Sequence, residues 1–85
     1  MITTNAIFTP VIATDKMSEI KKQIGRLIQE NRKAKGLSQA ELAALIGSNQ
    51  VVVSRYEMGT QNLTIDTIQK IATALKTDIS ITFKA

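Results

Sequence analysis

The chain of 85 residues contains no cysteine, no histidine and no tryptophan. Without cysteine no disulfide can form, and without cysteine or histidine the usual ligands of a zinc site are missing. The sequence also has no glycine-rich phosphate loop and no cluster of carboxylates, and no recognisable general base accompanies its serines. It therefore predicts a protein that is not an enzyme, with no metal site and no cofactor.

Long apolar runs are also missing. No stretch approaches the roughly 20 apolar residues that span a bilayer, and the N-terminus lacks the basic start and apolar stretch of a signal peptide. These absences predict a cytoplasmic protein with no membrane partner. A chain this short buries only a limited core. With disulfides and metals excluded, association into a homodimer is the expected source of further stability.

The net charge of +4 is concentrated in one part of the chain. Residues 16–35 hold seven basic and two acidic side chains, whereas residues 36–85 hold four of each. This distribution suits a protein that reads DNA bases and uses flanking basic residues for phosphate contacts. The alternative is that residues 16–35 form a helix with an ordinary solvated basic face.

Residues 38–59, SQAELAALIGSNQVVVSRYEMG, have the pattern of two short helices joined by a tight turn. Ser38, followed three residues later by Glu41, predicts a capping box at the start of the first helix. Gly47 suits the turn, because glycine adopts a positive φ without the steric cost that a side chain adds. The segment therefore predicts a helix-turn-helix.

These residues resemble the Xre and Cro-like helix-turn-helix family, which includes phage repressors and the DNA-binding antitoxins of bacterial toxin-antitoxin operons. The resemblance covers about residues 20–75, and its markers are GLSQAELA at 36–43, Gly47, SRYEMG at 54–59 and LTIDTIQKIATAL at 63–75. It implies an all-α, lambda-repressor-like helix-turn-helix domain of about four helices, with DNA as the ligand.

We expect three parts: an extended or flexible arm at 1–16, the helix-turn-helix DNA-binding domain at 17–76 and a dimerisation strand at 77–85. The first helix should run from about Met17 to Ala34, with Gly25 at a close-packing position, and Thr64 should cap a fourth helix that ends near Lys76. The apolar residues expected to face the core are Ile20, Ile24, Leu27, Ile28, Leu37, Ala40, Leu42, Ala43, Ile46, Val53, Tyr56, Ile65, Ile68, Ile71, Ala72 and Leu75.

The second helix of the helix-turn-helix should start behind a cap at Ser48 or Asn49 and place its outward face in the major groove. A glutamine amide can pair with adenine N6 and N7, an arginine suits guanine O6 and N7, and a valine can meet a thymine methyl. The expected base contacts are Gln50, Val51, Val52, Ser54 and Arg55. The resemblance implies phosphate contacts at Gln39, Asn49, Thr60, Gln61 and Asn62. It also implies a structural ion pair between Arg32 and Glu57.

The C-terminal residues Ile79, Ile81 and Phe83 alternate with polar residues, which predicts a strand. A fifth helix closes the domain in many phage repressors, so this ending is more similar to antitoxins of the HipB and HigA-related type. A lone strand leaves its backbone groups unpaired. Pairing with the same strand of a second copy across a twofold axis would satisfy them, and pairing with the N-terminal arm is the alternative.

These observations predict a homodimeric, sequence-specific repressor that binds a palindromic operator in double-stranded DNA. Residues 1–14 carry no charged side chain but several apolar ones, so this arm should dock on its own domain or on another protein. Together with the C-terminal strand, the arm points to the antitoxin of a type II toxin-antitoxin operon, which represses its own promoter and neutralises a cognate toxin. The alternatives are a stand-alone or phage-type repressor and a protein-interaction module that has lost DNA binding.

Overall fold

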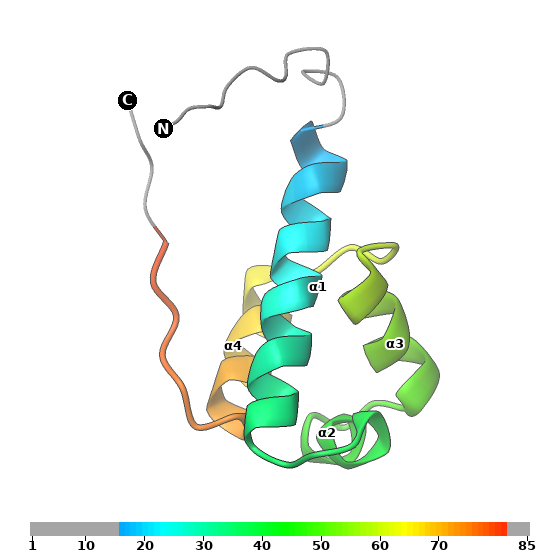
Figure 1. Cartoon of the computed structure of the whole chain (residues 1–85), viewed down its shortest axis with the longest axis vertical. Coiled ribbons are helices and arrows are strands. Elements are labelled where there is room, and N and C mark those ends of the chain that lie inside the picture. Colours follow the sequence, from blue (N-terminus) through cyan, green and yellow to red (C-terminus); the bar gives the residue numbers. More distant parts are fainter. Residues whose placement is uncertain (1–15, 82–85) are drawn as a thin grey trace.

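The computed structural model describes residues 16–81, which form four helices. They are α1 (Lys16–Ala34), α2 (Gln39–Leu45), α3 (Gln50–Met58) and α4 (Ile65–Ala74) (Figure 1). The prediction of an all-α domain with four helices is therefore confirmed. Residues 1–15 of the arm expected at 1–16, and Phe83 of the expected strand, lie outside the described residues. Lys16, the last residue of the expected arm, is the first residue of α1.

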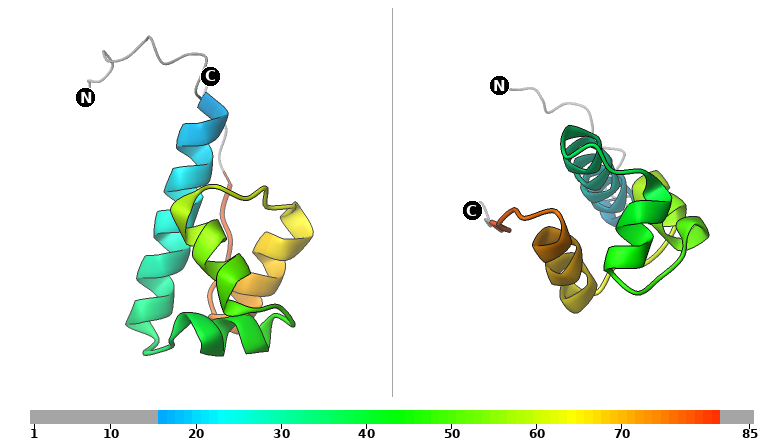
Figure 2. Two further views of the ribbon diagram at one scale, coloured as in Figure 1. Left: turned by 90° about the vertical axis from the view of Figure 1, so that its right-hand side faces the viewer. Right: turned by 90° about the horizontal axis from the view of Figure 1, so that it is seen from below.

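α1, the longest of the four helices, packs mainly against α3. Figure 1 shows α3 on one side of α1 and α4 on the other, with α2 running crosswise below them. In the left view of Figure 2, α3 lies in front, between α1 and α4, with α2 below it, so that α2 and α3 adjoin as the two arms of the helix-turn-helix. None of these helices is both long enough and apolar enough to cross a membrane.

The hydrophobic core lies where all four helices meet. Its buried members are Ile28, Leu42, Ala43, Val53, Ile71 and Leu75, and Ile24, Leu37, Ile46, Tyr56, Leu63 and Ala74 pack against them. Leu42 and Val53 are completely inaccessible to solvent. Because α2 and α3 each contribute one of these two side chains, the helix-turn-helix is fixed to the core from both arms.

Four of the residues expected in the core are exposed instead. Ile20 is 47% exposed, Leu27 is 57% exposed and Ile65 is 73% exposed, and Ala40 also faces solvent. On α1 the apolar stripe is wider than the surface that the other helices cover, and Ile65 is the first residue of α4. The periodicity was therefore a good guide to which face is apolar but not to how much of that face is covered.

Local hydrogen bonds set the helix starts. Ser38 and Glu41 form the predicted capping box, in which the Ser38 Oγ accepts from the Glu41 amide at 3.0 Å and the Ser38 amide donates to Glu41 Oε1 at 2.7 Å. Asn49, rather than Ser48, caps α3 by accepting from the Val52 amide at 3.1 Å. The predicted Thr64 cap of α4 is also present, but that helix ends two residues earlier than expected, at Ala74.

The turn between α2 and α3 depends on a glycine. Gly47 has φ 69°, a left-handed conformation that would cost a residue with a side chain about 1 to 2 kcal/mol. The prediction for this residue is confirmed. Since the turn sets the angle between the two arms, Gly47 contributes to the geometry of the recognition unit as well as to its stability.

Gly25 marks the closest approach of α1 and α3. A Cβ added at this position would lie 2.5 Å from the Glu57 carbonyl oxygen and would also clash with the Tyr56 carbonyl oxygen. Both obstacles are backbone atoms, which no side-chain rotation can move away. The predicted close packing is therefore confirmed, and it explains why α1 contains a glycine despite the cost of about 1 kcal/mol in a helix.

We expect Gly25→Ala to destabilise the domain by about 1 to 3 kcal/mol, although alanine is the better helix former, because α3 has to move away from α1. Urea unfolding followed by circular dichroism measures this change. Ala34→Gly at the exposed last residue of α1 is a control for the intrinsic effect of glycine in the helix. An equal or higher stability of Gly25→Ala would contradict the close approach.

The residues after α4 do not form the expected strand in the single chain. Residues 77–81 are irregular, and Lys76 turns the chain away from α4 with φ 56°. A strand is defined by hydrogen bonds to a neighbouring strand, and no other extended segment among the described residues supplies them. This segment runs beside α1 and α4, on the side away from α3 (Figures 1 and 2).

Candidate nucleic-acid interface

The outward face of α3 carries most of the residues expected to read bases. Gln50, Val51, Ser54 and Arg55 line a shallow hollow on this face, together with Met58 and Thr60. Val52 does not belong to this set, because it is half-buried on the flank of the helix. The structure thus brings four of the five expected base-reading residues together and separates the fifth.

Met58 is a member of this surface that was missing from the expected contacts. It is 62% exposed, and its sulfur lies 3.8 Å from the Ser54 hydroxyl, one helical turn earlier. The signal was present in the sequence, since Met58 follows Ser54 by four residues and therefore shares its face. With Val51, it makes this face partly apolar, which suits contact with thymine methyl groups.

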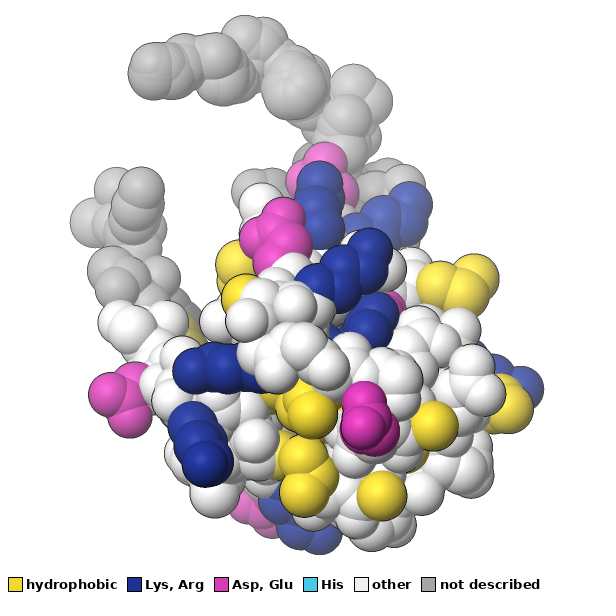
Figure 3. All heavy atoms as spheres, turned by 60° about the horizontal axis from the view of Figure 1, so that its bottom comes forward, with side chains coloured by type: hydrophobic (Ala, Val, Ile, Leu, Met, Phe, Trp, Pro, Cys, Tyr) yellow, Lys and Arg dark blue, Asp and Glu magenta, His cyan; other side chains and the backbone are white. Residues whose placement is uncertain are grey.

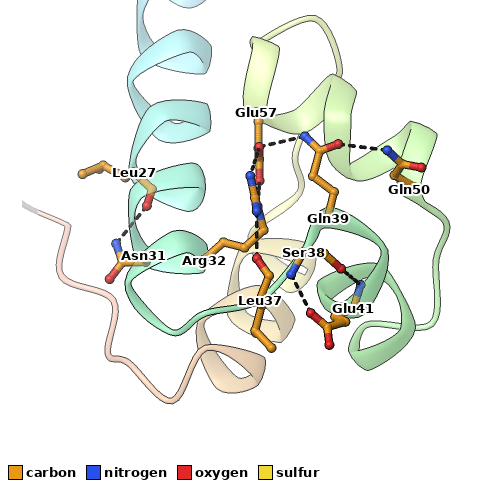
Figure 4. Close-up of polar contacts among 9 residues, drawn as sticks. All are labelled: Leu27, Asn31, Arg32, Leu37, Ser38, Gln39, Glu41, Gln50 and Glu57. Atoms are coloured by element: carbon orange, nitrogen blue, oxygen red, sulfur yellow. Dashed lines mark hydrogen bonds and ion pairs between the residues drawn. The ribbon is translucent and has the colours of Figure 1, made fainter.

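Gln39, one of the expected phosphate contacts, makes two side-chain hydrogen bonds within the domain. Its side-chain Nε2 donates to Glu57 Oε1 at 3.0 Å, and its Oε1 accepts from Gln50 Nε2 at 3.3 Å. Figure 4 shows the Gln39 amide between these two partners. The nitrogen and the oxygen of the amide each have one partner within the domain. The contact orients Gln50, the first residue of α3.

The carboxylate of Glu57 lies behind the recognition face and is paired with Arg32. Arg32 Nε donates to Glu57 Oε2 at 2.6 Å and Nη2 donates to Oε1 at 3.1 Å, a bidentate arrangement. The side chains are 9% and 2% exposed, respectively. The hydrogen bond to Glu57 raises the pKa of Arg32 above its usual value despite burial, so the guanidinium stays charged.

Arg32 also connects α1 to the start of the helix-turn-helix. Its Nη1 donates to the Leu37 carbonyl oxygen at 2.8 Å. A continuous set of hydrogen bonds thus runs from Leu37 through Arg32, Glu57 and Gln39 to Gln50 (Figure 4). It links α1, α2 and α3, and it ends at a side chain exposed on the recognition face. Pairing with Arg32 also neutralises a carboxylate that would otherwise repel DNA phosphates.

The other residues expected at phosphates surround this face. Asn49 is exposed, but its side-chain oxygen is used in the α3 cap. Thr60 donates to the Arg55 carbonyl oxygen at 3.4 Å and borders the hollow. Gln61 is half-buried and Asn62 is exposed in the loop between α3 and α4. The structure therefore places these residues at the two ends of α3, where a DNA backbone flanking the groove would pass.

Positive charge comes mainly from α1. Lys22, Arg26 and Lys33 are exposed on this helix, and Lys35 is exposed directly after it. Figure 3, which views the molecule from its lower side, shows basic side chains scattered over the surface with acidic ones between them. Arg32 of α1 is paired with Glu57 and does not add to this exposed charge. On α3 itself, the basic residue is Arg55. Within residues 16–81, no group of histidine, cysteine or carboxylate residues is arranged to hold a metal ion.

Comparison with known proteins agrees with this geometry. A family model described as helix-turn-helix matches residues 28–81, which is more than half of the chain. The chain belongs to this helix-turn-helix family. The matched region contains α2, α3 and α4 and the second part of α1. A comparison with curated proteins gives no match.

Two solved structures are similar to this chain. The restriction-modification controller protein C.AhdI from Aeromonas hydrophila is 38% identical, with a TM-score of 0.69, over 72% of this chain and 88% of that one. An HTH_3 family transcriptional regulator from Vibrio cholerae is 32% identical, with a TM-score of 0.68, over 73% of this chain. The match spans only 35% of the Vibrio protein. The family and these matches make the chain a helix-turn-helix transcription regulator.

Proposed function

We propose that this protein is a sequence-specific repressor that reads double-stranded DNA with α3. One observation carries the proposal: the exposed Gln50 amide and the exposed Arg55 guanidinium border the same hollow on α3. Gln50 is also hydrogen-bonded to Gln39. These two side chains supply bidentate contacts to adenine and guanine in the major groove. Such a regulator acts in the cytoplasm, where its promoter is accessible.

We further propose that the regulator binds as a homodimer to a palindromic operator. One recognition helix covers only a few base pairs, so two half-sites about one helical turn apart are needed for a useful specificity. A small core supports this assembly, because the described part of the chain buries few residues completely and leaves several large apolar side chains exposed.

Selection from a random duplex library tests this function. We expect enrichment of one palindromic sequence, and its affinity should decrease steeply as salt rises, because basic residues release counterions from the phosphates. The enriched site should lie in the promoter of the protein's own operon. Failure to enrich any sequence would contradict base reading, and an affinity that does not respond to salt would contradict phosphate contacts.

Two biological settings are compatible with this activity. Similarity to a restriction-modification controller protein over most of its length supports a stand-alone regulator. The antitoxin of a type II operon is a second candidate, because residues 77–81 after α4 are not helical and the sequence resembles antitoxins in this ending. In the second setting the same protein also neutralises a toxin.

Co-purification from the native cell extract separates the two settings. DNA recovered without a second protein is expected for a stand-alone regulator. DNA together with one stoichiometric small protein from the adjacent gene is expected for an antitoxin, and deletion of residues 1–14 should then abolish neutralisation but not operator binding. Protein recovered without DNA would contradict both settings and indicate an interaction module.

A further inference from the structure

An apolar groove lies on the side of the domain away from the recognition helix. It has a volume of about 350 Å³ and is bounded by α1, α4 and residues 77–81. Leu27 in its wall is 57% exposed and Ile81 at its edge is 66% exposed. These are large apolar side chains in contact with water, so a partner that covers them would gain stability.

The segment that borders the groove also has an open backbone edge. Along the described chain, the last backbone hydrogen bond is the one that the Thr77 amide donates to the Ala72 carbonyl oxygen, at 2.9 Å. Residues 78–81 make no backbone hydrogen bond to any other residue between 16 and 81. An open, extended edge of this kind pairs readily with another extended segment. The groove and the edge together therefore suit a partner that contributes a strand.

The sequence of this end is complementary to itself in one antiparallel register. If two copies meet with Ile81 on the twofold axis, Asp78 of each faces Lys84 of the other, Ile79 faces Phe83 and Ser80 faces Thr82. Residues 82–84 enter this argument only through their sequence. Opposite charges and apolar pairs directly across a two-stranded sheet are the stabilising combinations.

Neighbouring registers centred on a residue keep one kind of apolar pair, Ile79 with Ile81 or Ile81 with Phe83, but lose the charged pairs. Centring the pair on Ser80 places Lys84 opposite Lys76, which are like charges, and centring it on Thr82 places Lys84 opposite Ser80. Registers centred between two residues pair apolar with polar side chains, because successive side chains point to opposite faces. Self-complementarity about one residue is the property of an isologous interface between identical chains.

We infer that the occupant of the groove is a second copy of this chain, with residues 78–84 of the two copies paired antiparallel about Ile81. In this arrangement Ile79, Ile81 and Phe83 share the face of the two-stranded sheet that is turned to the groove between α1 and α4 of each copy. The charged pairs lie on the other face. The recognition helices remain free, because α1 and α4 separate this surface from α3 (Figures 1 and 2). The inference rests on the proposed homodimeric function and specifies its interface.

Charge exchange across the register is the sharpest test. Asp78→Lys and Lys84→Asp each replace two attractive pairs with two repulsive ones, so each should raise the dimer dissociation constant by roughly 5- to 50-fold. The double variant recreates both pairs with reversed polarity and should return the constant to within roughly threefold of the wild type. Asp66→Lys and Lys70→Asp, on the exposed face of α4, are controls for the change in net charge.

Sedimentation velocity over a concentration series measures these constants, and circular dichroism melting shows that each variant is folded. Ile81→Asp places two carboxylates on the axis and should weaken the dimer by more than roughly 100-fold. Ile65→Asp is its matched control, because Ile65 is even more exposed but lies outside the groove. A double variant that stays as weak as the single ones, or single variants that behave like their controls, would overturn the register.

Binding to half-site and palindromic duplexes separates this inference from the DNA-binding function. Ile81→Asp is expected to keep its half-site affinity and to lose the tighter binding to the palindrome. A wild-type chain that stays monomeric, or whose groove binds a different protein instead of a second copy, would overturn the inference. If the charge exchange rescues the dimer but no duplex is bound, the interface stands and the DNA-binding function fails.

Discussion

Glu57→Ala is expected to destabilise the domain by about 3 kcal/mol, a large fraction of the stability of a small protein. The substitution leaves the guanidinium of Arg32 buried without its counterion, since the two side chains are 9% and 2% exposed in the pair. It also removes the acceptor of the Gln39 side-chain amide. Urea unfolding, followed by circular dichroism, measures the loss.

Two controls identify the cause of this loss. Glu30→Ala, at an exposed position of the same charge, should change the stability by less than about 0.5 kcal/mol. Combining Arg32→Met with Glu57→Leu removes both charges and should recover much of the stability that Glu57→Ala loses. If Glu57→Ala were as stable as the Glu30→Ala control, the pair would be too hydrated to support the fold.

This result also affects how DNA-binding data are interpreted. Glu57 lies in α3, so a screen for loss of operator binding would select Glu57→Ala as a recognition mutant. Its carboxylate, however, is turned toward Arg32 and away from the hollow on the outer face. We therefore expect its binding defect to disappear under conditions that keep the variant folded, such as low temperature or a stabilising osmolyte.

The second large effect is expected for Gln50→Ala combined with Arg55→Ala. If each side chain makes one bidentate base contact, the pair contributes about 2 to 6 kcal/mol of discrimination between operator and unrelated DNA. The ratio of the two affinities should therefore fall by a factor of roughly 30 to 10⁴. The fold should be unaffected, because both side chains are exposed. Fluorescence anisotropy with the selected duplex and a scrambled one measures the ratio.

The matched control for this variant is Lys33→Ala, an exposed basic residue of α1. If Lys33 contacts a phosphate, its removal should weaken binding to both duplexes by a similar factor and reduce the salt dependence by about one counterion. The ratio of affinities should stay the same. An unchanged ratio in the Gln50 and Arg55 double variant would instead contradict base reading by α3 and favour a protein-interaction module.

The hydrogen bond between Gln50 and Gln39 couples the effects of substitutions at these two residues. Removing the Gln50 side chain also leaves Gln39 Oε1 without its partner, so part of the effect is a loss of order in the Gln39 side chain. Gln39→Ala keeps the Gln50 side chain but removes the hydrogen bond that orients it. A smaller loss of selectivity than in Gln50→Ala is expected if Gln39 acts through the orientation of Gln50.

Most of the helices could be predicted from the chain because their signals are local. The Ser38 capping box, the Asn49 and Thr64 caps and the turn at Gly47 each depend on residues within a few positions of one another. Of the two caps predicted for α3, Asn49 is the one present, and α4 ends two residues earlier than expected. Gly25 was also interpretable, because a glycine within a helix needs a packing reason.

Contacts between distant residues were decided only by the packing of the helices. Gln39 lies 18 residues from Glu57 and 11 from Gln50, and its spatial position between them depends on the angle at which α2 meets α3. The exposure of Leu27 likewise depends on where α4 and the following segment lie against α1. Hydrophobic periodicity shows which side chains share a face, but burial requires a partner that only the folded arrangement provides. The unpaired backbone of residues 78–81 has the same cause, because a strand exists only when a second extended segment lies beside it.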